Sequence, residues 1–172
     1  MRCISVAAAM VVLTGCGMVG GKTAEFACPR AGILKEAAAI TKFRPGPGRD
    51  LTDVIYQARL INLKAVCKYG RKGVTVDMTL ALAAERGPAI QGIKATLEYF
   101  VAIAGPGGSI LAKKEFATPV AFPNNVTQAR VADELQQIIP LRSGASGANH
   151  RIIVGFQLQR AELEYNRQQP RR

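Results

Sequence analysis

The sequence contains few of the residues from which catalytic and metal sites are built. Histidine occurs once, as His150, and cysteine occurs 4 times in 172 residues. A Ser-His-Asp or Cys-His arrangement would have to use that single histidine, and no serine lies in a Gly-x-Ser-x-Gly turn. The cysteines lack the short paired spacing of a closed zinc site. We therefore expect a protein that is not an enzyme and binds no cofactor or metal, with His150 exposed at a strand edge.

The sequence also lacks a uniformly apolar segment of the length that spans a membrane, about 20 residues. Its first apolar run, residues 4–13, follows Arg2 and ends in Leu13-Thr14-Gly15-Cys16. A basic start, a short apolar stretch and small residues before the cut are typical of a secretory signal. A cysteine directly after Leu-Thr-Gly predicts a lipoprotein signal, with residues 1–15 removed. The alternatives are an ordinary signal peptide with a chance cysteine, or an uncleaved anchor.

Cys16 would then carry a diacylglycerol on its sulfur and an acyl chain such as palmitate on its amino group. More than one chain is needed for stable attachment, because a single chain binds a membrane only marginally. The residue after the cysteine is Gly17 rather than the aspartate that favours the inner membrane. We expect an anchor on the periplasmic side of the cell envelope, in the outer rather than the inner membrane.

The chain after the signal divides into three parts. Residues 16–27 hold the lipidated cysteine and a flexible, Gly-rich tether. Residues 28–167 are long enough for one domain with a sizeable core, and residues 168–172 form a basic tail.

The number of cysteines that remain after processing is the number expected for a protein of an oxidising compartment. Cys3 leaves with the signal and Cys16 carries lipid, which leaves Cys28 and Cys67 as an even pair. We predict a disulfide between them, which would close a loop of about 40 residues and stabilise the fold by about 4 kcal/mol on the chain-entropy model. The alternative is two buried free thiols.

Positive charge is in excess, with 23 Lys and Arg against 12 Asp and Glu, a net charge of +11. Loss of Arg2 with the signal lowers it by one, to +10. Such a surface attracts anionic envelope components, namely lipid headgroups, lipopolysaccharide or another, acidic envelope protein. A basic surface that serves only solubility is the alternative. We expect no nucleic-acid partner, because the chain is anchored and lacks RNA-binding aromatic and zinc-finger patterns.

Most of the chain alternates apolar and polar residues with a period of two, the pattern of strands with one exposed face. The clearest segments are residues 74–85, 94–104 and 151–159. Turn signals rich in Gly, Pro and Asn separate such segments at similar spacing. We predict an antiparallel β-sandwich of about seven or eight strands, similar to immunoglobulin or fibronectin type III domains in architecture.

Three segments are less regular. In residues 52–69 the apolar face changes parity near Leu60 and Ile61, which predicts a β-bulge there unless both faces are buried. Residues 33–43 and 126–141 fit a helix or a strand. We interpret both as strands because their neighbours are strands, and we predict a short terminal helix over residues 160–167.

One turn carries candidate functional side chains. In residues 44–53, Arg44 and Arg49 flank two Pro-Gly pairs, and two such side chains around a turn suit an anion such as phosphate or carboxylate. The turn is not a P-loop, because Gly-Lys-Ser/Thr is missing. The alternative is a rigid connection in which the arginines pair with Asp50 or Asp53.

Several short motifs are spread over most of the mature chain, namely residues 44–53, Arg86-Gly87-Pro88, Tyr99-Phe100-Val101, residues 153–158 and residues 163–167. In these motifs the chain resembles a family of uncharacterised envelope lipoproteins from alphaproteobacteria. The resemblance implies an envelope location and assigns no catalytic or binding residue.

The sequence as a whole predicts a lipid-anchored, non-enzymatic binding or assembly module of the cell envelope. Sheet edges and end loops of a sandwich would serve its contacts. An envelope enzyme with an unrecognised site and a carrier of a small apolar ligand between the sheets remain alternatives.

Overall fold

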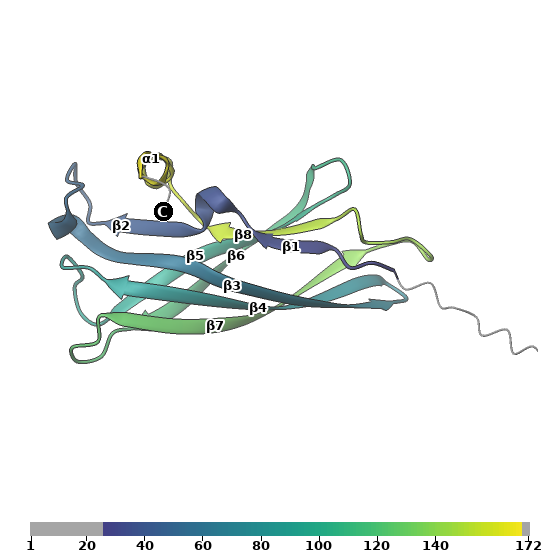
Figure 1. The fold of residues 1–172 in the computed structure, drawn as a ribbon, viewed down its shortest axis with the longest axis horizontal. Helices are drawn as coiled ribbons and strands as arrows, with labels where there is room; N and C mark the ends of the chain where they lie inside the picture. The colour runs from purple at the N-terminus through teal and green to yellow at the C-terminus, as the bar shows by residue number, and fades with distance from the viewer. Residues whose placement is uncertain (1–25, 170–172) are drawn as a thin grey trace, which may run out of the picture.

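The computed structural model describes residues 26–169, which form a sandwich of two four-stranded sheets (Figure 1). Sheet A has the order β1-β8-β5-β6 and sheet B the order β2-β3-β4-β7. The elements along the chain are β1 (Arg30–Ile33), η1 (Lys35–Ala37), β2 (Ala39–Phe43), η2 (Leu51–Asp53), β3 (Val54–Gly70), β4 (Gly73–Arg86), β5 (Lys94–Ala104), β6 (Ile110–Ala121), β7 (Gln128–Pro140), β8 (Arg151–Phe156) and α1 (Arg160–Gln168). The predicted all-β sandwich with a short C-terminal helix is confirmed. The predicted signal, residues 1–15, and Cys16 lie outside the described residues.

The alternation seen in the sequence places one face of each sheet in a common core. Along β4 every second side chain from Val74 to Ala84 is buried. Sheet A contributes large side chains from β5 and β8, and the fully buried residues include Tyr99, Phe122 and Phe156. Burial of these apolar side chains supplies the main favourable free energy of folding, about 1.5–3 kcal/mol for each large side chain.

The change of parity in β3 is resolved by a β-bulge at the predicted place. Leu60 pairs with Leu82 and Asn62 pairs with Ala81, so Ile61 is the extra residue. After the bulge, Leu63 and Cys67 return to the inner face. The extra residue therefore keeps one face of a 17-residue strand directed at the core.

The prediction of one strand over residues 33–43 is wrong, because the chain changes sheets within that segment. β1 pairs in parallel with β8 in sheet A, whereas β2 pairs with β3 in sheet B. The turn η1 makes the crossing. Its residue Ala37 packs so closely against Gly155 of β8 that a β-carbon added at Gly155 would lie 2.8 Å from the Ala37 Cβ. A strand cannot pair in both layers without such a break.

Residues 126–141 do form a strand, β7, and an inward carboxylate explains their ambiguous pattern. Asp133 points between the sheets, where Tyr99 Oη donates a hydrogen bond of 2.7 Å to Asp133 Oδ2. Thr118 Oγ1 donates to the same oxygen. Burial, and then the bond to Asp133, raise the pKa of Tyr99 well above its usual value. This network joins β5 and β6 of sheet A to β7 of sheet B.

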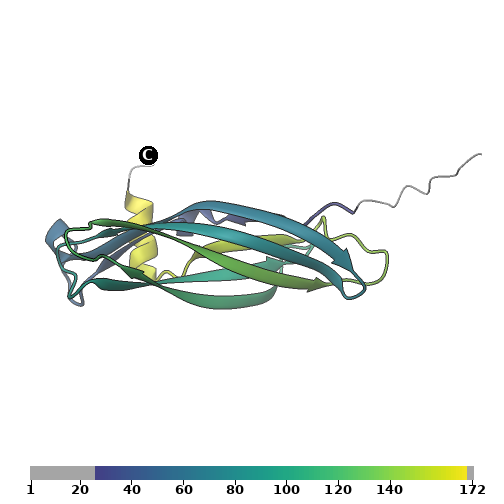
Figure 2. The same ribbon diagram turned by 90° about the horizontal axis from the view of Figure 1, so that it is seen from below.

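The helix α1 closes the opposite side of the sandwich, crossing the strands rather than following them (Figure 2). Glu162, which is buried, accepts a 2.8 Å hydrogen bond from Lys42 Nζ on β2. Tyr165 packs edge-on against Phe43, with ring centroids 5.0 Å apart. Strand β8 ends at Phe156, before the predicted end at residue 159, because the chain then leaves the sheet toward this helix.

Tyr56 connects the two sheets beside this helix. Its Oη donates a 3.1 Å hydrogen bond to the Thr96 carbonyl of β5. Burial, followed by the negative charges of Glu162 and Glu98, raises the pKa of Tyr56 from 10.0 to about 12. The folded protein therefore keeps this proton at pH values where the unfolded chain releases it.

We predict that replacing Tyr56→Phe alters how stability depends on alkaline pH. A raised folded-state pKa contributes stability that is complete below pH 10 and is lost as pH rises toward about 12. The stability advantage of the wild type over the variant should be constant below pH 10 and then shrink, at up to about 1.4 kcal/mol per pH unit. Urea unfolding followed by circular dichroism measures it. A difference that stays constant through the alkaline range would contradict this.

Candidate functional site

The two ends of the sandwich are built differently. At one end the described chain begins at Phe26, beside the β3–β4 turn and the β7–β8 loop (Figure 1). The basic loop, residues 44–53, lies at the other end between β2 and β3. The 17 residues of β3 connect these ends, a span of about 50 Å at about 3.3 Å per residue.

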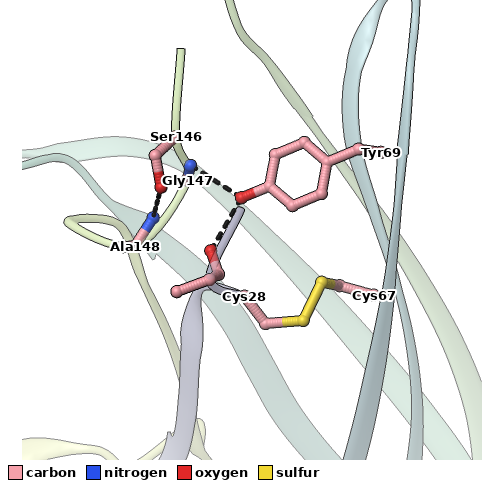
Figure 3. Close-up of a disulfide and its surroundings, with 7 residues drawn as sticks. Cys28, Cys67, Tyr69, Ser146, Gly147 and Ala148 are labelled. Atoms are coloured by element: carbon pink, nitrogen blue, oxygen red, sulfur yellow. Dashed lines mark hydrogen bonds between the residues drawn. A yellow bond between two sulfur atoms is a disulfide. The ribbon is translucent and has the colours of Figure 1, made fainter. Parts of the chain in front are cut away.

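The first described residues are fastened to the sandwich by the predicted disulfide (Figure 3). Cys28 is bonded to Cys67 on β3, with 5.9 Å between the two Cα atoms. The bond closes a loop with a sequence separation of 39. It lowers the entropy of the unfolded chain, which corresponds to about 4 kcal/mol of stability on the chain-entropy model.

Tyr69, two positions after Cys67 on the same face of β3, adds a second fastening that the sequence did not reveal. Its Oη donates to the Ala27 carbonyl at 2.7 Å and accepts a hydrogen bond from the Gly147 amide at 2.8 Å (Figure 3). Its ring lies 5.2 Å from that of Phe26. We call this group the clasp: Phe26, Cys28, Cys67, Tyr69 and Gly147. Phe26 and Ala27, assigned to the tether from sequence, are thus in contact with the domain.

His150 belongs to the same end and is buried, so the expectation of an exposed histidine is wrong. Only 9% of its surface is accessible, and Nδ1 has no hydrogen-bond partner among the described residues. The β7–β8 loop folds back onto the clasp through Gly147, whose carbonyl accepts from the His150 amide at 2.9 Å. A β-carbon on Gly147 would lie 3.1 Å from Tyr69 Oη, so a larger side chain would crowd this approach.

At the other end, Arg44 is paired with an acidic residue of its own loop. Arg44 Nη2 lies 2.5 Å from Asp53 Oδ1, and the Arg44 amide donates to the Asp53 carbonyl at 2.9 Å. Asp53 is buried, with 4% of its surface accessible, whereas the Arg44 side chain is 63% accessible. The arginine therefore neutralises a carboxylate that the fold has removed from water.

Arg49 binds the backbone of the same loop. Its Nη1 donates to the carbonyls of Gly46 and Gly48 at 2.9 and 2.6 Å. Its guanidinium group lies 5.2 Å from the centroid of the Phe43 ring. Glycine is required at 46 by a φ of +129° and at 48 because a β-carbon would lie 2.1 Å from Asp53 Oδ2.

A shallow hollow of about 270 Å³ lies between this loop and α1, and both arginines line it. Each guanidinium carries five N–H donors, so the internal bonds of Arg44 and Arg49 leave donors free for a further acceptor. The only carboxylate in the lining, Glu162, is paired with Lys42. The geometry brings the two predicted residues together, and anion binding there stays a prediction.

The part of the chain that the structure describes holds neither a metal-binding cluster nor a membrane-spanning helix. Within residues 26–169, no three His, Cys, Asp or Glu side chains lie close enough to hold a metal ion. No helix in that range is long and apolar enough to cross a bilayer. Comparison with known protein families found no family model that matches this chain, and comparison with curated proteins found no match.

We predict that Arg44→Ala destabilises the protein more than Arg49→Ala. Loss of Arg44 leaves the buried Asp53 without its ion partner and should cost about 1–2 kcal/mol of unfolding free energy. Loss of Arg49 removes only exposed contacts and should cost about 0.5 kcal/mol or less. Urea unfolding followed by circular dichroism measures both, and Arg44→Lys should recover part of the loss. Equal losses in the two alanine variants would show that Asp53 does not depend on Arg44.

Proposed function

We propose that this protein is a cell-envelope lipoprotein, anchored through acyl chains on Cys16, that acts as a non-enzymatic binding or assembly module. The observation that carries the proposal is the sequence Leu13-Thr14-Gly15-Cys16, which follows a short apolar run and a basic start. Gly17 favours the outer membrane. The resemblance to alphaproteobacterial envelope lipoproteins supports the same reading.

The disulfide supports an oxidising compartment. Cys28 and Cys67 are joined in the structure, and such bonds persist in secreted and periplasmic proteins but are rare in the cytosol. The bond also has a mechanical consequence for an anchored protein. A pull on the anchor would act on the clasp, where a covalent bond joins the incoming chain to the longest strand of the domain.

The anchor would hold one end of the sandwich at the membrane. Residues 17–25 separate Cys16 from Phe26, and a fully extended chain over this distance reaches at most about 35 Å. The basic loop lies at the far end of β3, about 50 Å from the clasp. If the long axis of the sandwich stands perpendicular to the membrane, the hollow beside Arg44 and Arg49 lies at the end far from the anchor. An acidic partner would bind there, away from the anchoring membrane.

Two long edge strands support a role in protein contacts. β6 and β7 are the outermost strands of their sheets and lie on the same side of the sandwich, joined by the bond from Thr118 to Asp133. Lys113, Lys114 and Pro119 in β6 are features that discourage pairing between copies of one protein. An open edge can instead accept a strand from a partner with a compatible sequence.

We predict that the mature protein begins with an acylated Cys16. Intact-mass and peptide mass spectrometry of the membrane fraction should show a diacylglycerol on this residue and no residues 1–15. The change Cys16→Ser should release the protein from membranes or leave the unprocessed precursor, because no sulfur remains to accept lipid. An unmodified mature terminus at another residue would refute the anchor.

A further inference from the structure

We propose that the clasp end of the sandwich binds anionic phospholipid headgroups directly. The inference rests on the proposed anchor only for its orientation, since the anchor would bring this end to the membrane. The surface consists of six exposed basic residues around the clasp: Arg30, Lys68, Arg71, Lys72, Arg142 and Arg151.

The fold gathers these residues from three strands, β1, β3 and β8, and from two connections, the β3–β4 turn and the β7–β8 loop. Lys68, Arg71 and Lys72 lie on the β3–β4 hairpin at its turn. Arg142 follows β7, whose last residue, Pro140, pairs with Gly73 at the same turn. Arg30 and Arg151 are register partners in β1 and β8. Arg30 lies two residues after the clasp residue Cys28, and Arg151 directly follows the buried His150.

Basic residues outnumber acidic residues in the half of the domain around the clasp. We define the clasp half by strand register, as the segments that lie beyond Tyr99 and Asp133 toward Phe26, residues 26–35, 64–79, 100–115 and 134–155. These segments contain 10 Lys and Arg and three acidic residues, Asp77, Glu115 and Glu134. The remaining described residues contain 9 Lys and Arg and 8 Asp and Glu. The charge is thus +7 in one half and +1 in the other.

The six side chains are free to meet a ligand. All are exposed, and none takes part in the three ion pairs found among residues 26–169. The nearest acidic residue along the hairpin is Asp77, which accepts a 2.7 Å hydrogen bond from Gln136. A cluster of like charges is unfavourable by itself, and anionic lipids would relieve the repulsion.

A membrane is the partner that suits this position. Basic groups within a Debye length of an anionic leaflet, about 8 Å at physiological ionic strength, are attracted to it. Each Lys or Arg near the surface strengthens such binding by about fivefold. Because the cations surround the point where the tether enters the domain, the acyl chains and the headgroup contacts would act on the same end.

The test uses the chain from Gly17 onward, exported behind a signal that leaves no cysteine, because this form contains every described residue and carries no lipid. Sedimentation with vesicles of phosphatidylcholine containing about 30% phosphatidylglycerol gives its affinity. We expect binding that weakens as salt rises and is absent with phosphatidylcholine alone. Because no acyl chain is present, the result is independent of whether Cys16 is lipidated, which is tested separately by mass spectrometry.

Two triple variants with the same change in net charge locate the surface. The first, Arg71→Gln, Lys72→Gln and Arg142→Gln, should lose about 100-fold in vesicle affinity. The second removes three exposed cations from the other half, Lys94→Gln, Arg130→Gln and Arg160→Gln, and should lose about fivefold or less. A further variant, Arg30→Gln with Arg151→Gln, tests the same surface on sheet A in case the hairpin changes disturb folding. Equal losses in both triple variants, or no binding to phosphatidylglycerol by the parent chain, would overturn the proposal.

Discussion

The clasp is the constraint on which the proposed orientation of this protein at the membrane depends. A disulfide and the hydroxyl of Tyr69 fasten the first described residues to the far end of the longest hairpin rather than to the middle of a sheet. Because β3 and β4 run the length of the sandwich, this fastening gives the molecule one end where the chain arrives and another about 50 Å away. Gly147 draws the β7–β8 loop into the same contact, so three separate segments become ordered together.

Two hydrogen-bonded side chains between the sheets mark the boundary between the two halves of the sandwich. Tyr99 and Asp133 join the two layers near the middle, and the charge changes across that line from +7 on the clasp side to +1 on the other. The arginines of the two halves differ in their exposure and in their partners. On the clasp side they stand exposed without acidic partners, whereas in the basic loop they support buried Asp53 and the backbone of a turn. In the proposed function, one domain would present one end to the membrane and the other end to another partner.

The sequence predicted the features that have a local cause. Alternation indicated the strands, the change of parity near Leu60 located the bulge, and the cysteine count predicted the disulfide. Features that depend on contacts across the fold were not accessible. Asp133 looked out of place in a strand because its partners come from another sheet, and the crossing at η1 had no signal beyond alanines that suit either structure. His150 became buried because a loop folds back onto the clasp.

The claim that the clasp end faces the membrane can be tested in intact envelopes with a photo-reactive amino acid. Placed at position 72, on the β3–β4 turn, it should form adducts with phospholipid on illumination. Placed at position 51 in the basic loop, where Leu51 is 76% accessible, it should form protein adducts or none. Phospholipid adducts at position 51 that equal or exceed those at position 72 would contradict the orientation.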